Sequence, residues 1–199
     1  MTRRLFLLLF LIAACFAVPR VPWIVAWDQG AIQAVASLRT PAWNDFFRVV
    51  TDIGSTYGFL VALLLPTLYF LLRRRFATAA WYFVGVGLLK LSGPFLKIAI
   101  ARPRPPDGIE SLTTFSMPSG HASNAVFMFG ILWVFLSRHF PHALSRSIFS
   151  ILCLGGIFLI DFSRVYLGVH YPSDVVLGSL YTAAGLAVLS SLRRDVFRP

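Results

Sequence analysis

Long apolar runs are the feature that most restricts the fold of this chain. Several of them approach the roughly 20 residues that an α-helix needs to cross the hydrocarbon core of a bilayer. The candidate spans cover residues 4–26, 54–72, 76–98, 120–137, 147–164 and 174–192. No long alternation of polar and apolar residues indicates a membrane β-barrel. The sequence therefore predicts an all-α, polytopic membrane protein with six transmembrane helices.

The composition indicates the same class of protein. Of the 199 residues, 57% are hydrophobic and 13% are charged, and the mean hydropathy is +0.75, which is too apolar for a water-soluble domain of this length. No repeat or linker divides residues 1–199, so we expect a single membrane domain. Cys15 and Cys153 both lie inside apolar runs, which predicts neither a disulfide framework nor a metal-thiolate cluster.

Two segments near the amino end need separate interpretation. Arg3 and Arg4 precede a short apolar run, residues 5–18, that looks like a signal peptide. Because apolar character resumes through residues 21–27, we favour an uncleaved first span, with processing as the alternative. Residues 28–51 then mix apolar residues with charged ones, which predicts an amphipathic, extracytoplasmic helical segment that lies at the interface and helps to collect a lipid substrate.

The formal net charge of +10 raises the question of a nucleic-acid partner. The basic residues, however, come in short clusters between apolar runs, so we expect membrane topology and no nucleic acid to explain them. The clusters at the termini and in alternate loops contain Arg3, Arg4, Arg73, Arg74, Arg75, Arg138, Arg146, Arg193, Arg194 and Arg198. The positive-inside rule predicts that these ends, both termini included, are cytoplasmic in a multi-pass protein of the inner (plasma) membrane.

Three polar motifs fall on the opposite, extracytoplasmic side of this topology. The first is K-x6-R-P, from Lys97 to Arg104 and Pro105, which alone is typical of a basic helix end. The second is P-S-G-H, residues 118–121, in which Ser119 and Gly120 begin a span. Alone it is better interpreted as a helix cap, although a helix amino terminus also attracts an anion.

The third motif is S-R-x5-H-x3-D, which contains Arg164, His170 and Asp174. Pro172 suits the first turn of the last span, so Asp174 can reach back towards His170. Together the motifs gather two histidines, an acid and three cations on one membrane face. Cations near hydrocarbon are costly, and an anionic ligand offsets that cost.

All three motifs match, in order, the signature of the type 2 phosphatidic acid phosphatase family. The chain resembles this family from the second span to the sixth, and its six-helix plan is most similar to the small bacterial members, which act on phosphatidylglycerophosphate or undecaprenyl pyrophosphate. The resemblance implies metal-independent hydrolysis of lipid phosphate monoesters or pyrophosphates, phosphatidic acid included, at the extracytoplasmic face. It leaves the preferred lipid open.

The resemblance also implies the roles of the site residues. His170 is expected to be the nucleophile that forms a phosphohistidine, Asp174 to orient it, and His121 to act as general acid and base. The residues expected to bind the substrate phosphate are Lys97, Arg104, Ser119, Gly120 and Arg164. Because no acidic cluster is available for a divalent ion, we expect no metal and no other cofactor.

Several alternatives stay open at this point. A lipid phosphotransferase uses the same residues with another acceptor, and a transporter of phosphorylated lipid uses the cations without cleavage. Lys90 and Asp161 lie inside spans, where an ionisable residue is a functional suspect, but we favour structural roles for both. Arg102 is expected to be a rim residue beside Arg104. The partners expected are the bilayer and a lipid phosphate, and the oligomeric state is open.

Overall fold

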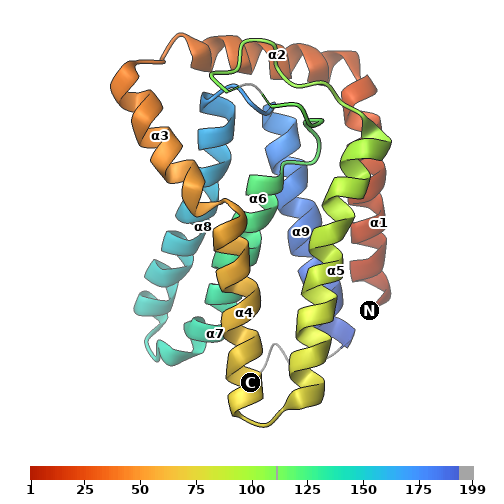
Figure 1. The fold of residues 1–199 in the computed structure, drawn as a ribbon, viewed down its shortest axis with the longest axis vertical. Coiled ribbons are helices and arrows are strands. Elements are labelled where there is room, and N and C mark those ends of the chain that lie inside the picture. The colour runs from red at the N-terminus through yellow and green to blue at the C-terminus, as the bar shows by residue number, and fades with distance from the viewer. Residues whose placement is uncertain (111, 193–199) are drawn as a thin grey trace.

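The computed structural model describes residues 1–110 and 112–192, so Arg193, Arg194 and Arg198 of the predicted basic clusters lie outside it. Helix α1 (Thr2–Ala17) runs along the bundle, and α2 (Pro22–Ala36) crosses one end of it (Figure 1). Helices α3 (Pro41–Ile53) and α4 (Thr56–Leu72) lead to the opposite end, and α5 (Phe76–Ile100) returns.

The second half of the chain supplies three further spans. The first, Gly120–His139, consists of α6 (Gly120–Ala125), a π-helical turn (Val126–Gly130), α7 (Ile131–Leu136) and a 3-10 turn (Ser137–His139). Helices α8 (Ala143–Tyr166) and α9 (Pro172–Leu192) form the other two. The part of the chain that the structure describes thus contains six helical segments long and apolar enough to cross a membrane, as the sequence predicted.

One predicted boundary near the amino end is wrong. The expected first span, residues 4–26, stops early: α1 passes into a 3-10 turn that ends at Arg20, and Val21 is extended before α2 starts at Pro22. Proline lacks the backbone N–H that a continuing helix needs, and the residue before it avoids the helical conformation. The expected second span, 54–72, agrees with α4 (Thr56–Leu72), and the candidate span Pro41–Leu72 is longer because it also includes α3.

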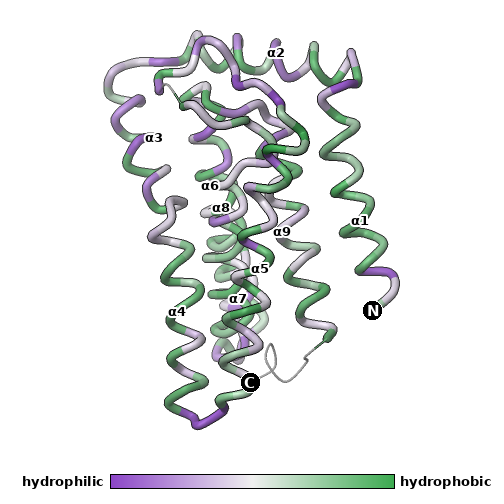
Figure 2. The backbone as a smooth tube through the Cα atoms, turned by 45° about the vertical axis from the view of Figure 1, so that its right-hand side comes forward, coloured by the Kyte–Doolittle hydropathy of each residue, from purple (hydrophilic) through white to green (hydrophobic). Residues whose placement is uncertain are grey.

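The polar residues gather at the two ends of the bundle. Figure 2 shows hydrophobic residues along α1 and α4, and hydrophilic ones at the turn after α4 and at the end that α2 covers. The amino terminus, the turn that contains Arg73, Arg74 and Arg75, and the connection from α7 to α8 lie at the end opposite α2 (Figure 1). The segment predicted to be amphipathic, residues 28–51, folds into parts of α2 and α3.

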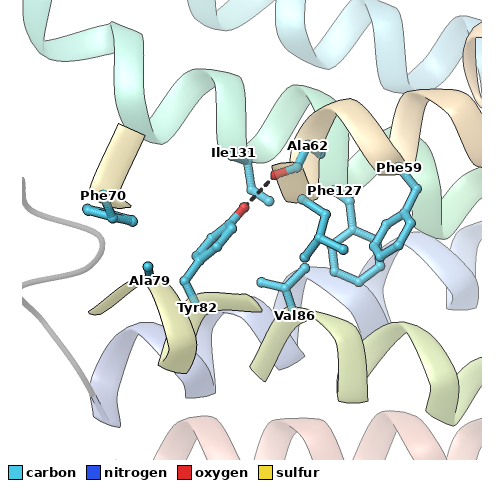
Figure 3. Close-up of a cluster of buried hydrophobic side chains, with 9 residues drawn as sticks. Phe59, Ala62, Phe70, Ala79, Tyr82, Val86, Phe127 and Ile131 are labelled. Carbon is cyan, nitrogen blue, oxygen red and sulfur yellow. Dashed lines mark hydrogen bonds between the residues drawn. The ribbon is translucent and has the colours of Figure 1, made fainter. Parts of the chain in front are cut away.

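A buried apolar cluster joins α4, α5 and the span that begins with α6 (Figure 3). It consists of Phe59, Ala62, Leu63, Phe70, Ala79, Tyr82, Val86, Phe127 and Ile131. Pro66 lies inside α4 and has no N–H to donate to the carbonyl oxygen of Ala62 one turn earlier. The hydroxyl of Tyr82 donates to that oxygen at 2.6 Å, so α5 supplies the hydrogen bond that α4 lacks.

We expect Tyr82→Phe to lower the free energy of unfolding by about 1–3 kcal/mol, because it leaves a buried carbonyl without this donor. In a Pro66→Ala background, the new amide of residue 66 donates to Ala62, and the same change should cost much less. Thermal unfolding of the four proteins in detergent measures the difference. An equal loss in both backgrounds would contradict the compensation.

Candidate active site

The loop between α5 and α6, of which the structure describes residues 101–110 and 112–119, folds back over the end of α5. Helix α5 stops at Ala101, which is left-handed at φ 52° and donates its N–H to the Lys97 carbonyl at 2.9 Å. The amide of Ser116 bonds to the Arg102 carbonyl at 2.9 Å, which closes the loop. The ammonium of Lys97 donates to the carbonyls of Phe115 and Ser116 at 2.7 and 3.0 Å. Lys97 is therefore held at the inner side of the loop.

The P-S-G-H motif forms the start of α6 and packs against α9. The Ser119 hydroxyl is fully buried and caps the helix by accepting from the amide of Ala122 at 3.4 Å. The Ser119 amide donates to the Asp174 carbonyl at 3.1 Å, and a Cβ at Gly178 would lie only 2.9 Å from the Ser119 carbonyl oxygen. Glycine thus permits the close approach of the motif and α9.

Two backbone donors remain at this helix start. The amides of Gly120 and His121 have no acceptor among the described residues, whereas the Ser123 amide donates to the Ser119 carbonyl at 3.1 Å. Unpaired amides at the start of a helix are suited to an anion. The cap therefore arranges the donors that the sequence predicted, with Gly120 among them.

His170 lies between a carboxylate and a guanidinium. Its Nδ1 is 3.5 Å from Oδ2 of Asp174, within ion-pair distance but without hydrogen-bond geometry, and its Nε2 is 3.2 Å from Nη1 of Arg104. A guanidinium can only donate, so Nε2 accepts and carries the lone pair, which leaves the proton on Nδ1, facing the carboxylate. This is the tautomer that a histidine nucleophile needs, and the predicted contact between His170 and Asp174 is present.

Arg104 bridges the loop and the segment after α8. Besides His170, its guanidinium donates to the Val169 carbonyl at 2.6 Å and to the carbonyl and hydroxyl of Thr114 at 2.7 and 2.9 Å. Burial lowers the pKa of Arg104 from its usual value, but the charge is retained at neutral pH because an arginine starts so far above it. A permanent cation therefore lies against the imidazole nitrogen that carries the lone pair.

Arg164 is connected to His170 by a backbone hydrogen bond. Its carbonyl accepts from the amides of Val169 and His170 at 3.2 and 3.3 Å, and its Nη1 donates to Thr51 of α3 at 2.7 Å. The side chain is almost fully buried, and its Nε has no hydrogen-bond partner among the described residues. The guanidinium has a carboxylate, that of Glu110, at 4.0 Å, but the buried Nε donor stays unsatisfied, which is costly and favours an anionic ligand at this place.

The structure adds two residues that the sequence analysis did not assign to the site, Asp28 and Ser173. Arg102, expected at the rim, is instead only 5% exposed, and that prediction is wrong. Its guanidinium lies 2.6 Å from Oδ1 of Asp174 and 2.6 Å from Oδ2 of Asp28, which also accepts from the Ser173 hydroxyl at 2.5 Å. The reason is that α2 crosses this end of the bundle and buries a carboxylate there.

This buried network fixes the carboxylate that faces His170. The Oδ2 of Asp174 accepts from the Tyr171 amide at 2.9 Å, while Oδ1 is bound by Arg102. Although burial disfavours charge on Arg102, the charge of Asp174 and the hydrogen bond to Asp28 raise its pKa. Asp174 therefore stays ionised and oriented towards the imidazole.

The two ionisable residues inside spans lie apart from this network. Lys90 donates to the side-chain oxygen of Asn124 at 2.5 Å, and Asp161 accepts from the Ser179 hydroxyl at 2.8 Å. Among the described residues, no group of three histidine, cysteine or acidic side chains is arranged to hold a metal ion.

Burial lowers the pKa of His170 to about 4, against the opposing effect of Asp174. We therefore expect the acidic limb of a kcat/KM profile to fall near pH 4 rather than near 6.5, because protonation removes the lone pair on Nε2. Asp174→Asn, which removes the charge that favours the imidazolium, should move the limb lower still. Initial rates of phosphate release, taken across the pH range, measure it.

Folding must be monitored in the same samples. The unfolded chain binds a proton on His170 more readily than the folded one, so stability is expected to fall as the pH drops from about 6.5 towards 4. Circular dichroism at each pH separates unfolding from titration. A limb near pH 6.5 in folded enzyme would contradict the assignment.

The six candidate spans define a multi-pass membrane protein, and one end of its bundle holds a buried histidine between a carboxylate and a guanidinium. The chain belongs to the PAP2 superfamily, whose family model matches residues 76–198. Together with the relatives below, this identifies the protein as a lipid phosphatase and a multi-pass membrane protein, as the three motifs predicted.

Three curated relatives are informative. Phosphatidylglycerophosphatase B of Bacillus subtilis is 29% identical over 154 residues, which cover 76% of this chain and 75% of the relative. Lipid A 4'-phosphatase of Porphyromonas gingivalis is 27% identical over 184 residues, covering 83% and 71%. Dolichyldiphosphatase 1 of Callithrix jacchus is 32% identical over 105 residues, covering only 48% and 43%.

A solved structure has the same fold. The crystal structure of a transmembrane PAP2-type phosphatidylglycerolphosphate phosphatase from Bacillus subtilis superposes with a TM-score of 0.82. The alignment covers 98% of both chains at 24% identity. The arrangement of the six spans in this chain is therefore that of a known PAP2 enzyme.

Proposed function

We propose that this chain hydrolyses lipid phosphate monoesters and diphosphates through a phosphohistidine on His170, with phosphatidylglycerophosphate, phosphatidic acid and undecaprenyl pyrophosphate as the substrates to test. The contact that carries the proposal is the donation from Arg104 to Nε2 of His170, opposite the carboxylate of Asp174. It places a lone pair beside a permanent cation, and this is the arrangement that attack on an anionic phosphoryl group requires.

The first half of the reaction transfers the phosphoryl group to the protein. Nε2 of His170 attacks phosphorus, the bond from phosphorus to the leaving oxygen breaks, and its electron pair goes to that oxygen. His121 donates a proton to the leaving group. Asp174, held by Arg102, stabilises the positive charge that develops on the imidazole.

The second half regenerates the enzyme. His121, now neutral, takes a proton from water, the water oxygen attacks phosphorus, and the bond between phosphorus and Nε2 breaks to release inorganic phosphate. His121 suits both steps because it begins α6 and is partly exposed, whereas His170 is only 2% exposed. One histidine thus meets water while the other is kept from it.

The cations bind the three equatorial oxygens of the phosphoryl group. Arg104 lies where the phosphate must approach Nε2, so substrate binding transfers its donors from the imidazole to phosphate oxygens. The unpaired Nε of Arg164 and the amide of Gly120 supply further donors, and Lys97 adds charge. Capping uses the Ser119 hydroxyl as an acceptor, which leaves its O–H to donate.

We place the site on the extracytoplasmic side of the inner membrane and both termini in the cytoplasm. The support is that the arginine-rich turn after α4 and the amino terminus lie at the end of the bundle opposite α2. Single cysteines introduced at Arg74 and at Asp107, in a chain whose Cys15 and Cys153 are replaced, test this by labelling with an impermeant maleimide.

The names of the relatives cover both substrate types, since a phosphatidylglycerophosphatase cleaves a monoester and a dolichyldiphosphatase cleaves a diphosphate. The test is release of inorganic phosphate by purified protein in mixed micelles that contain one lipid at a time. Hydrolysis of monoester and diphosphate lipids supports the proposal. Binding without release, or transfer of labelled phosphate to another lipid, would replace it with a transporter or a phosphotransferase.

A further inference from the structure

A cavity of about 200 Å³ lies between α5, α6 and α9, next to the proposed phosphate site. Its lining includes Lys90, Lys97, Pro118, Gly120, Ser123 and Thr182. Lys97 and Gly120 belong to the proposed phosphate-binding set, so the cavity borders that site. Its other end contains a second lysine, Lys90, which has no role in the reaction described above.

The side chain of Lys90 is held by the side-chain amide oxygen of Asn124. Both hydrogens of the Asn124 amide are engaged, because its nitrogen donates to the carbonyls of Gly54 and Ser55, each at 3.0 Å. The oxygen therefore accepts from Lys90, at 2.5 Å. The ammonium also lies 5.3 Å from the ring centroid of Phe59. Lys90 is thus held in one position.

Lys90 still has capacity for an anion. An ammonium has three N–H donors, and Asn124 accepts one of them. In the part of the chain that the structure describes, no carboxylate lies within ion-pair distance of Lys90. An unpaired ammonium group inside a membrane span is energetically costly. A purely structural hydrogen bond to Asn124 would not require a charged residue, so the charge of Lys90 favours a role in binding an anion.

The position of Lys90 matches one part of a substrate. Asn124 follows His121 by about one helical turn, and Lys90 precedes Lys97 by seven residues, or roughly 10 Å along α5. Both are deeper in the membrane than the proposed phosphoryl site. The lipid tail lies on that side, and so does the group that leaves when His170 attacks.

The leaving group differs between the two substrate types of the proposed function. A monoester releases a lipid alcohol, whereas a diphosphate releases a lipid monophosphate, whose bridging oxygen gains the electron pair of the broken bond. Only the second has a phosphate at the leaving oxygen itself, next to Lys90. A cation at this place therefore favours diphosphates over monoesters in the transition state.

We propose that Lys90, held by Asn124, forms a second phosphate subsite, which binds the lipid-linked phosphate of a diphosphate substrate while the terminal phosphoryl group passes to His170. This inference rests on the proposed function and names the substrate class that the site prefers. It makes Lys90 a specificity-determining residue, distinct from Lys97, which binds the phosphoryl group common to both classes.

The test compares two substrates with the same tail, farnesyl diphosphate and farnesyl monophosphate, in purified wild type and Lys90→Gln. Glutamine keeps a donor for Asn124 and removes the charge. We expect kcat/KM to fall by about tenfold or more for the diphosphate and by less than about threefold for the monophosphate. Lys97→Gln, the matched change seven residues along the same helix, should lower both.

Three results would overturn the subsite: an equal loss for both substrates in folded Lys90→Gln, no loss for the diphosphate, or loss of the diphosphate preference in Lys90→Arg, which keeps the charge. Thermal unfolding in detergent confirms folding, and Lys90→Met, of similar volume, carries the comparison if the glutamine variant does not fold. Wild-type protein that hydrolyses neither farnesyl compound, nor phosphatidylglycerophosphate, phosphatidic acid or undecaprenyl pyrophosphate, would refute the proposed function itself.

Discussion

Replacing His170 with alanine is expected to lower lipid phosphate hydrolysis by about 10³-fold or more, because it removes the atom that bonds to phosphorus. The fold should survive, since alanine leaves only a small cavity beside Arg104 and Asp174 and keeps the backbone hydrogen bond from residue 170 to the Arg164 carbonyl. The direct measurement is a quench in acid or base after mixing with a ³²P-labelled substrate. Wild type should carry an acid-labile, base-stable label, and His170→Ala none.

His142→Ala is the matched control, because this histidine is exposed at the opposite end of the bundle and should leave the rate unchanged. Vanadate, which adopts the five-coordinate geometry of the transferring phosphoryl group, should inhibit wild type. Near-normal turnover in folded His170→Ala, or label that persists in it, would remove this residue from the nucleophile's role.

Arg102→Leu is expected to lower the free energy of unfolding by about 3–5 kcal/mol, because it leaves the carboxylates of Asp28 and Asp174 buried without their common cation. Thermal unfolding in detergent measures the loss. The exposed pair of Arg48 and Asp45, at 3.1 Å, supplies the control, and Arg48→Leu should cost less than about 1 kcal/mol.

A second readout separates support of Asp174 from general stability. Asp28→Asn leaves Arg102 paired with Asp174, so it should lower stability yet retain most of the activity that Arg102→Leu loses at a temperature where both are folded. If Arg102→Leu is as stable as Arg48→Leu, the ion pairs of Arg102 with Asp28 and Asp174 contribute nothing measurable to stability, which would contradict the expected loss.

The sequence predicted the six spans because length and apolar composition alone determine whether a helix can cross a bilayer. It failed at residues 20–22, where hydropathy continues but Pro22 and the extended Val21 end the helix. A window of average hydropathy does not register a missing backbone donor. The fold was thus predictable where it depends on hydropathy summed over many residues, and less so where a single residue such as Pro22 ends a helix.

The candidate site was predictable only as a set of motifs. The spacing from His170 to Asp174 spans one helix start, so local geometry suffices to bring the two together. The contact of Arg102 with Asp28, by contrast, joins residues 74 positions apart. The K-x6-R-P motif singled out Arg104, which does face the histidine. The burial of Arg102 depends on how the loop after α5 folds, and the pattern R-P-R-P does not contain that information.

Helix α2 crosses the bundle end above the proposed site, and Asp28 fastens it there through two partners from other segments, Arg102 and Ser173. Swinging this helix outward would separate opposite charges in a place that water does not reach, at a cost of several kcal/mol. We therefore do not expect α2 to open and close as a lid. Lipid substrates must therefore reach the site without displacement of α2, by lateral entry from the leaflet in which they already reside.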